Sequence, residues 1–116
     1  MNRQEVFDKC LAHLREQGEK SRDDRRGCLY RGPNGLMCAV GCLIDDEHYD
    51  AAFEGQGAEG CLIVQEAIEK SLKCKIGHDD LVLLSEMQSI HDDWKPRDWE
   101  SRFKRLAEEE NLKYTT

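Results

Sequence analysis

Apolar residues recur every three or four positions over residues 3–17, and this spacing predicts an amphipathic helix. Asn2 is a residue type that caps helix starts, and Gly18 is one that ends them. The apolar stripe of this helix consists of Val6, Phe7, Cys10, Leu11 and Leu14.

Three later segments have the same periodicity. A helix is predicted from Leu62 to near Cys74, and a second one starts at Asp79 and Asp80 and runs into His91-Asp92-Asp93. Pro96 introduces the last helix, which turns Trp99, Phe103, Leu106 and Ala107 inward.

The region between the first two helices has shorter signals. Pro33-Asn34-Gly35 is turn chemistry between two apolar pieces, so residues 28–38 are predicted to form a hairpin. Residues 39–44 fit either a strand or a helix. A short helix is favoured because it brings Cys38, Cys42 and the small Gly41 onto one side, where another element can approach closely. The acidic, glycine-containing residues 45–60 are predicted to be a loop.

These elements predict a mainly α (α+β) fold: a compact bundle of about four to five helices with one short β-hairpin after the first helix. A length of 116 residues suits a single domain, here residues 1–116. The predicted core comprises Phe7, Leu11, Leu14, Leu43, Ile63, Ile68, Leu84, Met87, Trp99, Phe103 and Leu106.

The charge is distributed unevenly along the chain. The net charge is −7, and residues 32–93 alone carry 3 basic and 13 acidic side chains, a balance of −10. An acidic middle disfavours general nucleic-acid binding, which depends on Lys and Arg at the phosphates. The acidic residues 45–59 suit either a solubilising loop or a surface that meets a basic protein partner.

The apolar runs are too short for a membrane span, and the N-terminal residues lack a signal-peptide pattern. We therefore expect a cytoplasmic protein with no membrane partner. The six cysteines are expected to be reduced and mostly buried, without disulfides.

Residues 28–49 hold the densest group of chemically active side chains. Cys28, Cys38, Cys42 and His48 are of the types that bind zinc, but their spacing matches no common zinc finger. We expect no bound metal and no cofactor.

A second hypothesis is nucleophilic catalysis, in which Cys38 or Cys42 is paired with His91 as the base and Asp92 as the orienting acid. Adjacent residues on a helix point about 100° apart, which predicts poor geometry for a bond between His91 and Asp92. The favoured hypothesis is structural. In it, an imidazolium at His91 is stabilised by the negative end of its helix and bonds to backbone or a carboxylate, fixing the corner between the last two helices, while Asp92 caps the turn.

A third hypothesis is a small phosphorylated ligand. Arg22, Arg25, Arg26 and Arg31 lie near Tyr30 and a glycine-containing turn, and guanidinium groups with an aromatic ring bind phosphate esters by bidentate contacts and stacking. The candidate ligand residues are Arg26, Tyr30, Arg31, Tyr49 and His91.

Two clusters of residues resemble a group of small uncharacterised bacteriophage and prophage proteins. The first runs from Tyr30-Arg31-Gly32 through Gly35–Ile44 to Asp46-Glu47 and Tyr49, and the second comprises Leu84, Met87-Gln88, Ile90-His91-Asp92 and Trp99. The resemblance implies a phage accessory protein in the cytoplasm of a bacterial host. It provides no catalytic residues that could be carried over to this chain.

The function expected from the resemblance is binding. The partner is a host protein, such as a defence enzyme that the phage protein antagonises, or a small phosphorylated nucleotide that it sequesters. A Cys/His-dependent hydrolase or transferase and a small zinc protein are the alternatives, and a homo-oligomer stays open.

Overall fold

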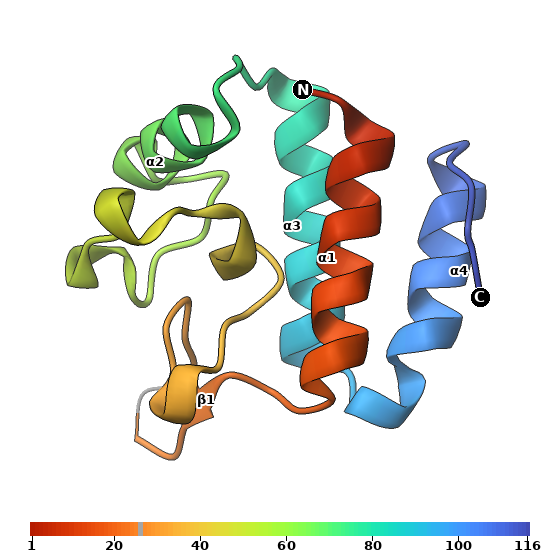
Figure 1. Cartoon of the computed structure of the whole chain (residues 1–116), viewed down its shortest axis with the longest axis horizontal. Coiled ribbons are helices and arrows are strands. Elements are labelled where there is room, and N and C mark those ends of the chain that lie inside the picture. Colours follow the sequence, from red (N-terminus) through yellow and green to blue (C-terminus); the bar gives the residue numbers. More distant parts are fainter. Residues whose placement is uncertain (26) are drawn as a thin grey trace.

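The computed structural model describes residues 1–25 and 27–116. Within these residues it has four α-helices, α1 (Arg3–Gln17), α2 (Leu62–Leu72), α3 (His78–Asp93) and α4 (Trp99–Glu109). A two-stranded antiparallel hairpin, β1 (Arg22–Asp23) and β2 (Gly27–Cys28), follows α1 (Figure 1). The predicted fold class is therefore confirmed.

The first helix begins and ends at the predicted residues. The Asn2 side chain accepts a hydrogen bond of 3.0 Å from the backbone N–H of Glu5. Gly18 adopts a left-handed conformation with φ 69°, and its N–H donates to the carbonyl of Leu14. Asn2 and Gly18 thus cap the two ends of α1, as the sequence predicted.

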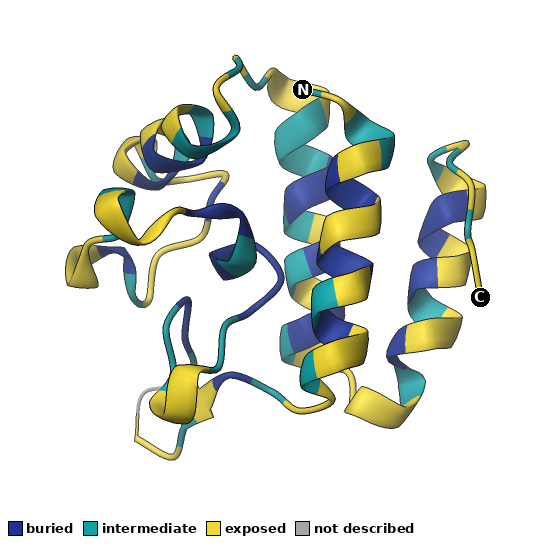
Figure 2. Cartoon of the chain, viewed as in Figure 1, coloured by how far each residue is buried: buried dark blue, intermediate teal, exposed yellow. Residues whose placement is uncertain are grey.

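Helices α1, α3 and α4 form one half of the molecule, and we call residues 1–18 and 78–116 the helical half. In Figure 1, α4 runs in the opposite direction to α1 and α3. The rings of Phe7 and Phe103 meet edge to face with centroids 5.6 Å apart, and Leu84 and Met87 are fully buried. Apolar faces therefore hold this half together, as the buried stripes in Figure 2 show.

Residues 19–77, which we call the loop-rich half, consist largely of turns. Four 3-10 turns precede α2 in the part of this half that the structure describes: η1 (Pro33–Gly35), η2 (Gly41–Leu43), η3 (Asp46–His48) and η4 (Ala51–Phe53). Turn η2 packs against both α1 and α2, and η3 also contacts α2. Leu43, Phe53, Val64 and Ile68 of this half join the same core as the helical half.

The hairpin lies earlier in the chain than predicted. The paired strands flank residues 24–26, whereas the predicted hairpin over residues 28–38 is reduced to the single bridge between Arg31 and Met37. The backbone N–H of Leu29 donates to Ser21, and those of Tyr30 and Arg31 donate to Glu54, so they do not pair with residues 36–38. The short helix predicted over residues 39–44 is the 3-10 turn η2.

The close approach predicted at Gly41 is confirmed. A Cβ atom at Gly41 would lie 2.3 Å from the carbonyl oxygen of Tyr30, so only glycine fits against this backbone. The core prediction is wrong at one position, Ile63, which is 48% exposed. The inner face of α2 is formed by Val64, Ala67 and Ile68, and this leaves Ile63 on the outer face.

None of the helices in the described part of the chain combines the length and the apolar character needed to cross a membrane.

Candidate functional site

A pocket of about 380 Å³ lies where the end of α3 meets the loop-rich half. Its walls come from the segment that begins in β2, from α3, and from the predicted acidic loop. The described residues that line it are Cys28, Leu29, Tyr30, Cys38, Gly55, Gln56, Gly57, Gln88, Asp92 and Asp93. Asp92 and Asp93 are the charged members of this set, and no Lys or Arg is among them.

The Asp92 carboxylate is held in place by two neighbours. His91 Nδ1 lies 2.7 Å from Asp92 Oδ1, and Gln88 Nε2 donates to the same oxygen at 2.7 Å. The backbone N–H of Val40 donates to Gln88 Oε1 at 3.0 Å, so the amide can direct only its NH₂ group to Asp92. Asp92 is thus a fixed carboxylate in the wall of the pocket.

The prediction of poor geometry between His91 and Asp92 is wrong. The 100° separation applies to the Cα–Cβ bonds of adjacent helical residues, whereas the two side chains converge beyond Cβ. Asp92 therefore binds His91 and Gln88 instead of capping the turn after α3.

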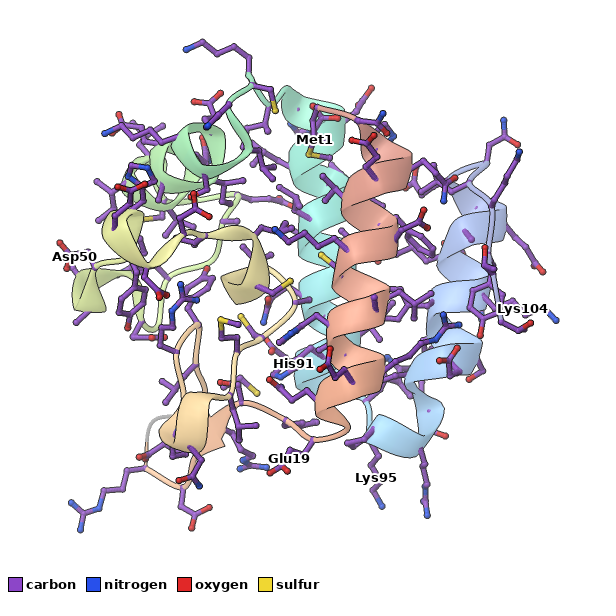
Figure 3. All side chains as sticks on the ribbon, in the orientation of Figure 1. Met1, Glu19, Asp50, His91, Lys95 and Lys104 are labelled. Atoms are coloured by element: carbon purple, nitrogen blue, oxygen red, sulfur yellow. The ribbon has the colours of Figure 1, made fainter. Side chains whose placement is uncertain are left out.

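His91 is fully buried near the end of α3 (Figure 3). The backbone N–H of Ser21 donates to His91 Nε2 at 3.0 Å, and the imidazole stacks on Trp99 with centroids 5.5 Å apart. Because an N–H group can only donate, Nε2 accepts and Nδ1 carries the proton that is donated to Asp92. The ring is neutral in this arrangement, which corrects the expected imidazolium.

His91 does bond to backbone and to a carboxylate, as the structural hypothesis expected. Its backbone partner is Ser21, which follows α1, so the side chain joins the two halves of the molecule. The stack on Trp99 also brings it to the start of α4. Both imidazole nitrogens are committed, and neither is free to accept a proton from a cysteine.

The cysteines of the pocket are poor nucleophiles. Burial and the nearby Asp92 carboxylate raise the pKa of the Cys28 thiol to about 11, and burial raises that of Cys38 well above its ordinary range. Cys38 Sγ also accepts the N–H of Gly41 at 3.3 Å. At neutral pH both side chains are thiols, whereas attack on a substrate needs the thiolate.

The neighbours of the Cys42 thiol are the carbonyl of Ala39 and the thiol of Cys10. The Sγ atoms of Cys42 and Cys10 lie 3.0 Å and 3.3 Å from the carbonyl oxygen of Ala39, which can accept from either thiol. Hydrogen bonding between the two thiols lowers the pKa of Cys42 and, with burial, raises that of Cys10. The pair is part of the packing between α1 and η2.

Cys28, Cys38, Cys42 and His48 do not come together as one set of ligands. Among the described residues, two groups have ligand atoms within 4.8 Å of one another: Cys28, His91 and Asp92, and the largely exposed Asp45, Glu47 and His48. A metal on His91 Nδ1 would put a proton on Nε2, facing the N–H of Ser21. The first group is therefore arranged for hydrogen bonding.

Arg31, a candidate ligand residue, is bonded to its own chain. Its guanidinium donates to the carbonyls of Gly41 and Ile44, both at 2.6 Å, and to Asp46 at 3.1 Å. It also lies over the ring of Tyr49, 5.0 Å from the centroid. Arg31 thus connects η2 and η3 to the strand-like segment before η1.

Tyr30 and Tyr49 contribute to the same internal network through Glu54. The carboxylate of Glu54 accepts the backbone N–H groups of Tyr30 and Arg31, at 2.8 Å and 3.1 Å, and the hydroxyl of Tyr49 at 2.6 Å. Tyr30 also lines the pocket. Arg26 lies outside the described residues.

Three residues of the site have roles that the sequence interpretation did not assign: Ser21, Glu54 and Gln88. Gln88 had a usable signal, because it precedes Asp92 by four positions and residues so spaced meet on a helix. Glu54 and Ser21 carry no such signal, since each is paired with a group far along the chain. Glu54 accepts the backbone N–H of Tyr30, and the backbone N–H of Ser21 donates to the side chain of His91.

Comparisons of the chain with protein-family models, curated proteins and solved structures find no match. The function is therefore inferred from the geometry and charge of the pocket, and the resemblance to bacteriophage proteins stays a prediction.

Proposed function

We propose that this protein acts by binding, and that its pocket holds a cationic group of a partner protein, a lysine or arginine side chain, against Asp92. The observation that carries the proposal is a carboxylate fixed by two hydrogen bonds in a pocket whose described lining has acidic but no basic side chains. A carboxylate held in this way needs no reorganisation to receive an ammonium or guanidinium group.

The walls of the pocket suit a cation. Tyr30 supplies an aromatic surface, and aromatic rings attract cations over their faces. Lys20 is one of the bases near the pocket, and its ammonium group donates to the backbone carbonyl of Asp92 at 2.8 Å. A volume of about 380 Å³ accommodates a long basic side chain.

The surroundings favour a protein as the source of the cation. One wall of the pocket is formed by Gly55, Gln56 and Gly57. These residues belong to the acidic segment 45–59, for which the sequence suggests a basic protein partner. A phosphorylated ligand fits less well, because Asp92 and Asp93 would repel its charge. A basic segment of a host protein is thus the better of the two partners that the sequence left open.

The test is a titration of the ¹⁵N-labelled protein with Nα-acetyl-arginine amide. Nα-acetyl-citrulline amide is the matched neutral control, since it keeps the shape and removes the charge. We expect the arginine compound to shift the amide signals of Tyr30, Gln88 and Asp92. Citrulline should bind at least about tenfold more weakly, which corresponds to losing one charge-assisted hydrogen bond.

Asp92→Asn should weaken arginine binding by about tenfold or more, because the amide keeps the size but not the charge. Asp79→Asn removes the same charge from an exposed position at the other end of α3 and should leave binding unchanged. Equal binding of citrulline and arginine, or binding of adenosine monophosphate in this pocket, would contradict the proposal.

A further inference from the structure

Two large apolar side chains at the start of α2 are uncovered. Leu62 is 74% exposed and Ile63 is 48% exposed, which is unusual for adjacent aliphatic residues. The third exposed large hydrophobic among the described residues, Trp94, differs from them because the guanidinium of Arg102 lies 3.5 Å from the centre of its ring. No guanidinium group of the described residues is recorded over Leu62 or Ile63 in this way.

A groove of about 310 Å³ adjoins Ile63, between α2 and the turns η3 and η4. Its inner surface includes Phe53 and Ala67, which are both buried residues of the core, and Tyr49, whose ring meets that of Phe53 edge to face. An apolar side chain entering this groove would contact Phe53, Ala67 and Ile63 together.

The rim of the groove is acidic. Glu47, Asp50 and Glu66 are exposed carboxylates among its described lining residues. The bases in this lining are Lys70 and His48, whose Nε2 lies 3.6 Å from Glu47 Oε1. Asp50 lies at the outer edge of the loop-rich half in Figure 3. Two copies of the chain would bring these rims together and repel, so charge complementarity favours a different, basic partner.

We propose that Leu62, Ile63 and this groove form a docking surface, the α2 surface, for a short segment of a partner protein in which one apolar side chain is flanked by lysine or arginine. The apolar side chain enters the groove beside Ile63, and the flanking bases meet Glu47, Asp50 and Glu66. The surface is separate from the Asp92 pocket and does not depend on the function proposed for that pocket.

The test uses an acetylated and amidated pentapeptide with one leucine between two pairs of lysines. The matched control peptide has glutamate in place of each lysine. Titration of the ¹⁵N-labelled Asp92→Asn variant keeps the Asp92 pocket from contributing. We expect the lysine peptide to shift the amide signals of Phe53, Ile63 and Ala67, to bind more weakly as salt is added, and the glutamate peptide not to bind.

Leu62→Ser/Ile63→Ser should weaken binding of the lysine peptide by at least tenfold. Both side chains are exposed, so this variant should stay folded, which circular dichroism checks. The control Lys104→Ser/Glu108→Ser changes two exposed residues of α4 and should bind as before; Lys104 lies at the opposite edge of the molecule from Asp50 (Figure 3).

Three results would overturn the inference: no binding of the lysine peptide at millimolar concentration, equal binding of the glutamate peptide, or unchanged binding by the Leu62→Ser/Ile63→Ser variant. Sedimentation that shows a dimer lost in this variant would instead assign the α2 surface to a second copy of the chain.

Discussion

The two halves of the molecule are held together by different kinds of contact. In the helical half, backbone groups pair within helices and apolar faces such as those of Phe7 and Phe103 join the helices. In the loop-rich half, Arg31 donates to the carbonyls of Gly41 and Ile44, and Glu54 accepts the backbone N–H of Tyr30. Where regular structure is missing, a few polar side chains supply the hydrogen bonds that buried backbone requires.

The largest effect should come from the core of the helical half. Leu84 is fully buried, so Leu84→Ala should lower the free energy of unfolding by about 2–5 kcal/mol, through lost transfer energy and a cavity. Because both halves share one core, hydrogen exchange should speed up in both. A denaturation midpoint equal to that of the unmodified protein would contradict this placement.

Arg31→Lys should open the loop-rich half selectively. An ammonium group cannot reach the carbonyls of Gly41 and Ile44 with the fork geometry of a guanidinium, and the expected loss is about 1.5–3 kcal/mol. Hydrogen exchange should accelerate over residues 36–54 and change little in α4. Arg22→Lys, at the exposed residue of strand β1, is the control. If hydrogen exchange accelerated equally in both halves, the hydrogen bonds of Arg31 would not stabilise the loop-rich half selectively.

His91→Ala tests the connection between the halves. The change strands the N–H of Ser21 and removes the stack on Trp99, so stability should fall by about 1–3 kcal/mol. The control His78→Ala alters an exposed residue at the other end of α3 and should have little effect. Equal melting temperatures for the His91 and His78 variants would mean that His91 does not connect the halves.

The smallest effect concerns the Cys28 thiol. The pKa of this thiol is raised to about 11 in the folded state, against about 8.5 for a free thiol. The folded state therefore favours the protonated thiol. This contribution to the free energy of unfolding is present below pH 8.5 and is lost as the pH rises towards 11. The rate of alkylation by iodoacetamide, followed by mass spectrometry, should keep rising up to about pH 11. In urea the rate should level off near pH 8.5. The same plateau in the folded protein would contradict the raised pKa.

The helical half could be predicted from the sequence because periodicity and caps are local signals. Asn2 and Gly18 close α1 as expected, and the buried positions of α3 and α4 follow their apolar spacing. The prediction placed Ile63 in the core, although it is exposed. The apolar pattern of the sequence does not distinguish a residue on the inner face of α2 from one beside that face.

The candidate site was predictable only in part. His91 and Asp92 were singled out by residue type, but the bond between them depends on how two side chains bend at the end of α3. The contacts of Arg31 and Glu54 depend on successive 3-10 turns, which have no apolar period. Such long-range contacts between side chain and backbone leave no pattern along the chain.

The hydrogen bonds of Arg31 and Glu54 in the loop-rich half also affect how easily this protein could change its binding specificity. The two anchors fix the path of the backbone, whereas Glu47, Asp50 and Gln56 direct exposed side chains outward from it. Mutation at these outward positions would alter recognition while the loop keeps its shape. The loop-rich half, which has less regular structure, is thus the half in which surface residues can vary most easily. A library of variants at these exposed positions would keep the same backbone conformation.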